Sequence, residues 1–188
     1  MFYLFTITGA TLLIALFNFL LSATYSWLEF GSILLWTSLG TVSVIAIDGF
    51  LAFVIRRMPE KWFSPEAKAF SVPKWERNLY RKTKINVWKK HVPEWGCFTG
   101  FHKDELRDAS DAKYIGRFLL ESNYGVLGHV AGAIFGFLII LLPFLRPLTM
   151  ALPIAIVNFI LSMLPTMILR YNTTPLRRLY KRAADSKR

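Results

Sequence analysis

The sequence reads KWERNLYRKTKINVWKK from Lys74 to Lys90, a run in which aromatic residues are interleaved with cations. This run is the centre of a basic and aromatic insert, Arg56–Glu121, with a pair of apolar segments on either side of it. The insert holds too many aromatic side chains for a disordered tract, which lacks the apolar groups needed to form a core. The insert therefore lies between two membrane-embedded pairs of segments, and its composition predicts a folded element outside the bilayer.

The composition is typical of an integral membrane protein. Of the 188 residues 54% are hydrophobic, and the mean hydropathy is +0.38, which is too apolar for an ordinary soluble domain. The net charge of +11 would suggest nucleic acid in a soluble protein, but here the basic residues lie in the segments that flank the spans. That distribution favours anionic membrane lipids and an acidic donor as partners, and it predicts no nucleic acid. Cys97 is the only cysteine, so no internal disulfide is possible.

Four apolar segments reach the ~20 residues that a helix needs to cross a bilayer. They cover residues 2–27, 30–55, 126–145 and 147–169. The connections Leu28–Glu29 and Arg146–Pro147 are so short that each pair is expected to form a tight helical hairpin. The sequence thus predicts one all-α membrane domain, residues 1–188, with four transmembrane helices in two hairpins, a cytosolic amphipathic helical insert at 56–121 and a cytosolic tail at 170–188.

The basic residues predict the orientation of the chain. The insert holds 15 Lys and Arg, the tail holds 7, and the two hairpin turns together hold only Arg146. By the positive-inside rule, the insert, the tail and both termini are expected in the cytoplasm, as parts of a multi-pass protein of the cell membrane. The first apolar run has no basic region before it and is longer than a signal-peptide core, so we expect it to be retained as a helix.

Periodicity within the insert predicts helices on the membrane surface. Two sets of residues share helical faces: Trp75, Leu79 and Lys82, and Tyr80, Lys84 and Trp88. These sets predict a helix from about Pro73 to His91, lying in the head-group layer with its rings toward the acyl chains. Asp104–Glu121 has the composition of a second amphipathic helix that leads into the third span. In the tail, Tyr171–Pro175 is expected to form a turn before a short basic segment.

Ionisable residues inside the spans are candidates for chemistry, because an unpaired charge in hydrocarbon is costly. Asp48 lies eight residues before Arg56, roughly 12 Å along the second helix from its cytoplasmic end. His129 follows Glu121 by eight residues, so it reaches a similar depth, where Asp48 could orient it as a general base. The alternatives are structural: Asp48 is protonated or paired near the interface, His129 bonds to a carbonyl or head group, and Glu121 pairs with Arg117.

Other small and polar residues in the spans suit helix packing better than catalysis. Asn18 and Asn158 are buried amides, for which we expect hydrogen bonds between helices. Gly128, Gly132 and Gly136 form a ridge of small residues on the third span, which predicts close contact with a neighbouring helix.

The sequence contains no recognisable metal or cofactor motif. Four possible ligands have a spacing that fits no zinc signature: His91, Cys97, His102 and Asp104. No P-loop, G-x-G-x-x-G or G-x-S-x-G motif is present, and no activating partner is fixed for Cys97. We therefore expect neither a metal nor a tightly bound cofactor.

Three groups of residues resemble the glycosyl-4,4'-diaponeurosporenoate acyltransferase family, small membrane enzymes linked to the last step of staphyloxanthin-type carotenoid synthesis. The similar residues are Lys74–Tyr80 with Lys82, Lys84, Trp88 and Lys89, then Glu121 followed by His129, and Leu169–Asn172 after the fourth span. The resemblance extends over most of the chain from Trp62 onward, and the plan of four spans is also similar.

The resemblance implies transfer of a fatty acyl group to a hydroxyl of a glycosylated isoprenoid or other glycolipid. The acyl donor would be acyl-coenzyme A or an acyl carrier protein, and a lipid would be the acceptor. In this scheme His129 takes the hydroxyl proton, Glu121 or Asp48 sets its tautomer, and Arg170 or Lys84 steadies developing negative charge. The residues implied in substrate binding are Trp75, Glu76, Tyr80, Lys84, Trp88, Arg170 and Asn172.

Two other classes of function fit parts of the sequence. A lipid-binding or lipid-carrier membrane protein without enzymatic activity would also use an aromatic and cationic insert. A membrane reductase or methyltransferase of isoprenoid type would also have a basic tail, but it would need a cofactor site.

Overall fold

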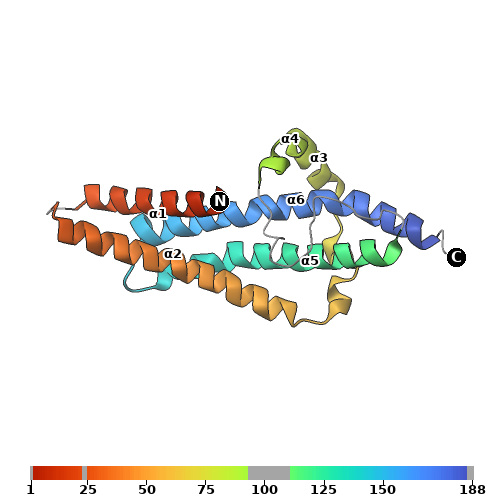
Figure 1. Cartoon of the computed structure of the whole chain (residues 1–188), viewed down its shortest axis with the longest axis horizontal. Coiled ribbons are helices and arrows are strands. Elements are labelled where there is room, and N and C mark those ends of the chain that lie inside the picture. Colours follow the sequence, from red (N-terminus) through yellow and green to blue (C-terminus); the bar gives the residue numbers. More distant parts are fainter. Residues whose placement is uncertain (1, 23–24, 93–110, 186–188) are drawn as a thin grey trace. The chain divides into compact units, whose positions relative to one another are not determined.

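The computed structural model describes residues 2–22, 25–92 and 111–185, and these form helices and no strands (Figure 1). The longest elements are α1 (Phe2–Leu20), α2 (Trp27–Arg56), α5 (Ala112–Phe135) and α6 (Leu152–Asp185). The shorter elements are η1 (Glu60–Phe63), η2 (Lys68–Phe70), α3 (Lys74–Lys82), α4 (Ile85–Trp88), η3 (Lys89–His91), η5 (Gly136–Leu141) and the π-helical turn η6 (Pro147–Ala151). The prediction of an all-α membrane protein is confirmed, since within these ranges four helical segments are long and apolar enough to cross a bilayer.

The chain folds as two compact units, which we describe separately. Unit 1 comprises residues 1–53 and 129–163, and unit 2 comprises residues 54–128 and 164–188. Unit 1 is built from α1, most of α2, the end of α5 with η5 and η6, and the first part of α6. Its buried core includes Ala15, Val44, Ile139, Met150 and Ala155, whereas many large apolar side chains remain exposed on its surface. A surface of this kind is suited to contact with lipid chains.

The ends of the membrane helices differ from the predicted spans. The first helix ends at Leu20 instead of continuing to residue 27. The second begins at Trp27, because the hydroxyl of Ser26 accepts a hydrogen bond from the backbone N–H of Glu29 at 3.1 Å and caps the helix. The third begins at Ala112, well before the predicted Val126, and the carboxylate of Asp111 accepts a hydrogen bond from the N–H of Lys113 at this start. Hence the described part of the predicted 104–121 helix and the third span are one helix.

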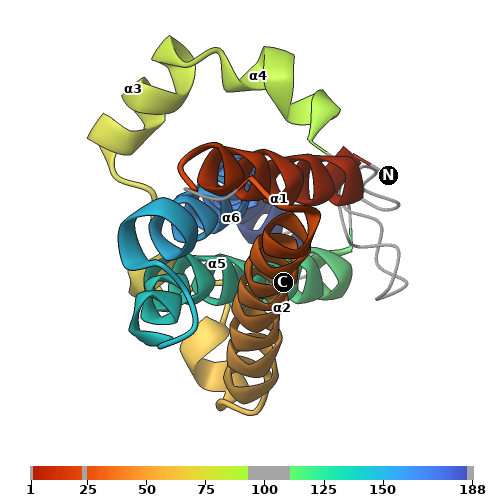
Figure 2. The ribbon, with the colours of Figure 1, turned by 90° about the vertical axis from the view of Figure 1, so that its left-hand side faces the viewer.

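The helix predicted from Pro73 to His91 is wrong: the structure has α3, α4 and η3 in its place, and Figure 2 shows α3 and α4 as separate helices that run in different directions. The break occurs at Lys84, whose φ of 51° and ψ of 43° lie in the left-handed region that ends a helix. The indole N–H of Trp88 donates to the carbonyl of Thr83 at 3.0 Å, which satisfies one of the last carbonyls of α3. Consequently Tyr80, Lys84 and Trp88 do not share one helical face.

The turn predicted at Tyr171–Pro175 is also absent, because α6 continues without interruption to Asp185. Pro175 lies inside the helix and leaves a backbone carbonyl without its usual partner. Packing maintains the helix here, since Leu176 and Ala183 belong to a buried cluster of unit 2 with Leu119 on α5. The prediction failed because a proline ends an isolated helix, whereas tertiary contacts hold this one together.

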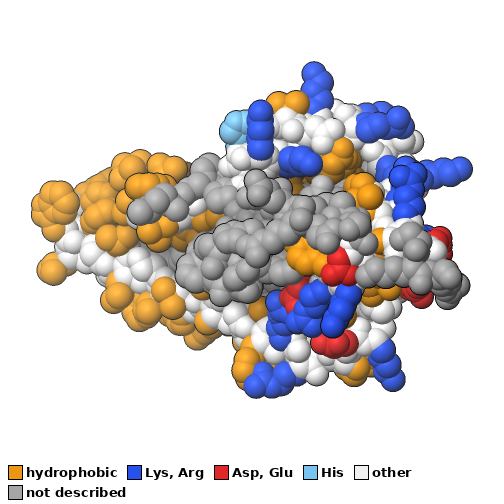
Figure 3. Space-filling view, turned by 45° about the vertical axis from the view of Figure 1, so that its right-hand side comes forward, with side chains coloured by type: hydrophobic (Ala, Val, Ile, Leu, Met, Phe, Trp, Pro, Cys, Tyr) orange, Lys and Arg blue, Asp and Glu red, His pale blue; other side chains and the backbone are white. Residues whose placement is uncertain are grey.

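Unit 2 carries the basic surface. All Lys and Arg residues except Arg146 fall within its sequence ranges. In the space-filling view, Lys and Arg side chains project from the surface (Figure 3). Inside unit 2, Tyr80 and Ile85 of the insert pack against Ile168 of α6, with Trp88 and Tyr171 beside them. The insert is therefore anchored to α6 by one face of α3 and α4.

Candidate active site

Asp48, a predicted site residue, packs against the backbone of α5 inside unit 1. The Gly132 residue of α5 leaves the space that Asp48 occupies, since a Cβ built on Gly132 would lie 2.6 Å from Asp48 Oδ1. Asn158 of α6 lies beside both residues. Its Nδ2 donates a hydrogen bond to the Gly132 carbonyl oxygen at 3.2 Å and lies 3.5 Å from Asp48 Oδ1. The carboxylate thus has a polar partner within the span, as the cost of burying a lone charge requires.

His129 lies on α5 three residues before Gly132, so it is about one helical turn from the point where Asp48 meets the helix. Its side chain is partly buried. The orienting role predicted for Asp48 toward His129 stays a prediction, and the structure places the Asp48 carboxylate against Gly132 of the same helix.

The small-residue ridge predicted on the third span, which is α5 with η5, permits close packing at two of its three glycines. A Cβ on Gly136 would lie 2.6 Å from Asn158 Nδ2, so Gly136 also permits close packing. A Cβ on Gly128 would meet nothing within 4 Å. The amide of Asn18 behaves as predicted for a helix-packing residue, because its Nδ2 donates to the carbonyl of Thr149 at 2.7 Å.

Glu121 is held by two arginines in unit 2. Its Oε2 lies 2.5 Å from Arg56 Nη1, and its Oε1 lies 2.8 Å from Arg117 Nη2. The structural alternative predicted for Glu121, an i, i+4 pair with Arg117, is therefore observed. Arg56 also lies over the ring of Tyr124, with 5.2 Å between its Cζ and the ring centroid. Both oxygens of Glu121 are engaged in ion pairs.

Sequence reasoning missed the residues after Glu121, which anchor the start of the insert to α5. The fully buried Asn123 donates from Nδ2 to the carbonyls of Phe63 at 2.9 Å and Ser64 at 3.3 Å. The hydroxyl of Tyr124 donates to the carbonyl of Met58 at 2.9 Å, and its ring stacks on that of Phe63 with 3.9 Å between centroids. In the sequence, the only sign of this anchor was the polar pair Asn123 and Tyr124 at the start of an apolar span.

Three of the predicted substrate-binding residues form one buried cluster in unit 2. Arg170 Nε donates to Glu76 Oε1 at 2.5 Å, Arg170 Nη2 donates to Glu76 Oε2 at 2.6 Å, and the Tyr80 hydroxyl also donates to Oε1. Burial alone raises the pKa of the Glu76 carboxyl, but the hydrogen bonds from Arg170 and Tyr80 and the charge of Arg170 outweigh burial and lower this pKa. Burial and the Glu76 carboxylate raise the pKa of Tyr80, so its hydroxyl remains a donor. This cluster fastens α3 to α6.

The other predicted substrate-binding residues are separate from that ion pair. Trp75 is 67% exposed on the outer face of α3, and Lys84 is exposed at the break after it. Trp88 is partly buried in the cluster formed with α6, and Asn172 is partly buried on α6. Only Trp75 and Lys84 of these four are therefore well placed to meet a ligand that arrives from solution or from the lipid surface.

No group of three or more His, Cys, Asp and Glu side chains that could hold a metal ion is found in the ranges 2–22, 25–92 and 111–185. Cys97, His102 and Asp104 lie outside the described residues.

Comparison with known proteins gives one family. The family model described as glycosyl-4,4'-diaponeurosporenoate acyltransferase matches residues 59–182, which is more than half of the chain. No curated protein and no solved structure matches the chain. The matched region includes Glu76, Glu121, His129 and Arg170, and the resemblance inferred from these residues is confirmed. The chain belongs to the glycosyl-4,4'-diaponeurosporenoate acyltransferase family.

Proposed function

We propose that this protein is a membrane enzyme that transfers a fatty acyl group to a sugar hydroxyl of a glycosylated isoprenoid or a related glycolipid. The observation that carries the proposal is the family match over residues 59–182. The contact of Asp48 with Gly132, three residues after His129 on α5, supports it, because the proposed reaction needs a base and an orienting carboxylate on membrane-spanning helices.

The proposed reaction needs one base and two positioned substrates. His129 takes the proton from the sugar hydroxyl while the hydroxyl oxygen attacks the carbonyl carbon of an acyl thioester. The carbon–sulfur bond then breaks, the ester forms, and the imidazolium returns its proton to the leaving thiolate. Asp48 stabilises the imidazolium and holds the tautomer of His129. Binding both lipids in the same membrane site converts a two-body reaction into a positioned one.

The basic surface of unit 2 supports an acidic acyl donor, either acyl-coenzyme A or an acyl carrier protein (Figure 3). Exposed Lys84 on the insert is the proposed contact for the acidic donor. Arg170, already bound to Glu76, would contribute by fixing the insert on α6. We propose no role for a tightly bound cofactor.

The proposed orientation has the insert, the tail and both termini in the cytoplasm of the cell membrane. Single cysteines introduced at exposed positions of the insert, in a chain without Cys97, should react with an impermeant maleimide only after the cells are opened. Labelling of intact cells would contradict this orientation.

The activity can be tested with purified protein in lipid nanodiscs, a glycosylated isoprenoid acceptor and radiolabelled acyl-coenzyme A. Replacing His129 by alanine should abolish ester formation while leaving the yield of folded protein unchanged. His91→Ala, an exposed histidine on η3, is the matched control and should retain activity. Full turnover by His129→Ala would refute the proposed base.

The alternative is a protein that binds lipid without transferring acyl groups. The aromatic and cationic insert favours this possibility, because binding lipid at the membrane surface needs no base. Retention of lipid by the purified protein, with no ester formed from either donor class, would decide for the alternative.

A further inference from the structure

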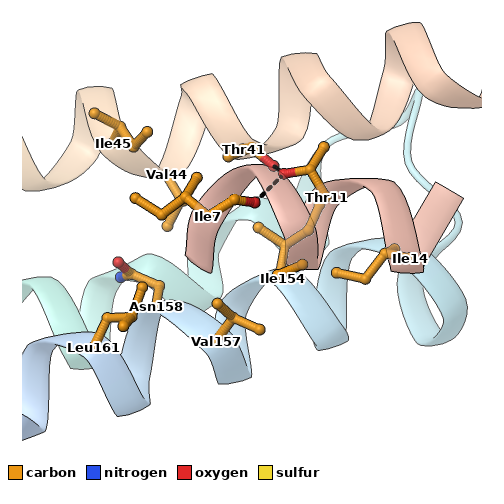
Figure 4. Close-up of a pocket in the computed structure, with 11 residues that line it drawn as sticks. Ile7, Thr11, Ile14, Thr41, Val44, Ile45, Ile154, Val157, Asn158 and Leu161 are labelled. Carbon is orange, nitrogen blue, oxygen red and sulfur yellow. Dashed lines mark hydrogen bonds between the residues drawn. The ribbon is translucent and has the colours of Figure 1, made fainter. Parts of the chain in front are cut away.

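The hydroxyls of Thr11 and Thr41 show how polar side chains of unit 1 are satisfied by the protein itself (Figure 4). Thr11 donates to the Ile7 carbonyl at 2.8 Å and lies 3.0 Å from the Thr41 hydroxyl, which donates to the Thr37 carbonyl at 3.1 Å. In the described ranges, four buried side-chain nitrogen or oxygen atoms lack a hydrogen-bond partner, and only one of them belongs to a charged group. That atom is Nε of Arg177, on α6 in unit 2. A buried donor of a charged group is costly to leave unpaired, so the surroundings of Arg177 are informative about function.

Arg177 is not needed to satisfy the backbone that it contacts. Its Nη2 donates to the Ala67 carbonyl at 2.7 Å, but that carbonyl already accepts the N–H of Phe70 at 3.2 Å. Arg170, two turns earlier on the same helix, differs because it is neutralised by the carboxylate of Glu76. None of the ion pairs observed among the described residues includes Arg177. Its positive charge therefore has no structural partner in this part of the chain.

More positive charge surrounds Arg177. Lys181 follows it by four residues on α6, so the two side chains are neighbours on one helical face, and Lys181 is exposed. Lys68 is exposed next to Ala67, in the segment that Arg177 contacts. Glu66 also adjoins Ala67, but it is exposed and belongs to none of the ion pairs observed in the described ranges. The junction of α6 with segment 64–72 is therefore a cluster of cations without a bound carboxylate.

We propose that Arg177, with Lys181 and Lys68, binds the phosphate group of a phosphate ester. The guanidinium presents its N–H groups as a fork that matches phosphate oxygens, and phosphate accepts from several cations at once. The side chain as a whole is partly exposed, so an anion can reach it. Because Nε is buried, the guanidinium must turn toward the surface as the phosphate binds. The hydrogen bond that it then gives up is to the Ala67 carbonyl, which keeps the N–H of Phe70.

Two kinds of molecule present this group: an acyl donor built on coenzyme A, and a phospholipid of the bilayer. In the first case the inference rests on the proposed function, because it names the part of the donor that the protein recognises. In the second case it is independent of acyl transfer. Both are measured as binding, so neither measurement needs an ester to form.

The first arm of the test is calorimetric titration of coenzyme A into the full-length protein in a maltoside detergent, which has no phosphate of its own. Arg177→Gln should raise the Kd by roughly tenfold or more, the loss expected when a hydrogen bond between charged groups is removed. Arg178→Gln is the matched control, because it removes the same charge from the adjacent, exposed residue and should change the Kd much less. Arg177→Lys keeps the charge but not the fork, so it should also weaken binding, and it replaces Arg177→Gln if that variant does not fold.

The second arm is native mass spectrometry of phosphatidylglycerol retained by the same proteins. A loss in the Arg177 variants confined to coenzyme A would assign the site to the donor, and a loss confined to phosphatidylglycerol would assign it to the lipid. Equal weakening by Arg177→Gln and Arg178→Gln would mean general attraction by the basic surface and would overturn the site. Unchanged binding of both ligands in the Arg177 variants, or no binding of either by the wild-type protein, would overturn it too, while acyl transfer could still stand.

Discussion

The replacement of Gly132 by alanine is a direct test of the site around Asp48. The new methyl group would lie 2.6 Å from Asp48 Oδ1 and 3.0 Å from its Cγ, whereas ordinary contacts begin at 3.4 Å. The carboxylate must therefore move by roughly 0.8 Å or rotate away, and either change disturbs its place beside the turn that carries His129. Misplacement of a catalytic group by about 1 Å can lower a rate by about 100-fold.

The effect on stability should be much smaller than the effect on rate. Overpacking typically costs about 1–3 kcal/mol, and the better helix propensity of alanine offsets this by about 1 kcal/mol. We therefore expect Gly132→Ala to be folded, with a loss in free energy of unfolding within about 2 kcal/mol and a turnover reduced by up to about 100-fold.

Gly128→Ala is the matched control, because it lies one turn earlier on the same helix and its added methyl would meet nothing within 4 Å. The assay is ester formation in nanodiscs with thermal unfolding of both variants in the same detergent. If Gly132→Ala and Gly128→Ala both formed ester at the wild-type rate, Asp48 would have no part in the reaction and the proposed site would be wrong.

Two further predictions concern unit 2. Glu76→Gln leaves the partly buried Arg170 without its counter-charge and should lower the free energy of unfolding by about 1–3 kcal/mol, whereas the exposed Glu66→Gln should have little effect in the same thermal assay. Because the pKa of Glu76 is lower in the folded state, the stabilisation by Glu76 is present above the ordinary carboxyl pKa of about 4.3 and is lost as the pH falls through the lowered pKa. Wild-type protein should therefore lose stability at acid pH more than Glu76→Gln does. The same acid loss in both proteins, or none in the wild type, would contradict the assignment. Asn123→Ala should cost about 1–3 kcal/mol by removing the side-chain donor of the Phe63 carbonyl, and proteolysis of the insert should reveal it; equal protection in Asn123→Ala and the exposed Asn86→Ala would argue against the anchor.

Much of the candidate site could be named from the sequence, but its pairings could not. Asp48 was identified because a carboxylate inside a span is costly, and His129 because it lies at a similar depth. Neither argument indicates that Asp48 rests on Gly132 with Asn158 beside it, since this depends on how three helices pack. Asp48 also precedes the matched family region, so only the fold places it against Gly132 of the helix that carries His129.

Glu76 and Arg170 show the same limit. Both were expected to bind substrate because they belong to the residues that resemble the family, yet the structure joins them to each other across 94 positions of sequence. An ion pair between distant positions has no periodic signature. The surface residues of the same set, such as Trp75, keep the exposure that substrate binding needs.

By itself, the sequence determined the membrane class, the number of apolar helices and the position of the basic insert, because these depend on composition averaged over ~20 residues. The tertiary structure decided the break at Lys84, the continuation of α6 through Pro175, and the position of the Asp48 carboxylate. The reason is physical: local propensity is worth about 1 kcal/mol or less for most residues, and contacts between distant segments outweigh it at each of these points. The basic and aromatic run from Lys74 to Lys90 depends on both levels. Its sequence predicts an element at the membrane surface, and its contacts with α6 determine how that element folds.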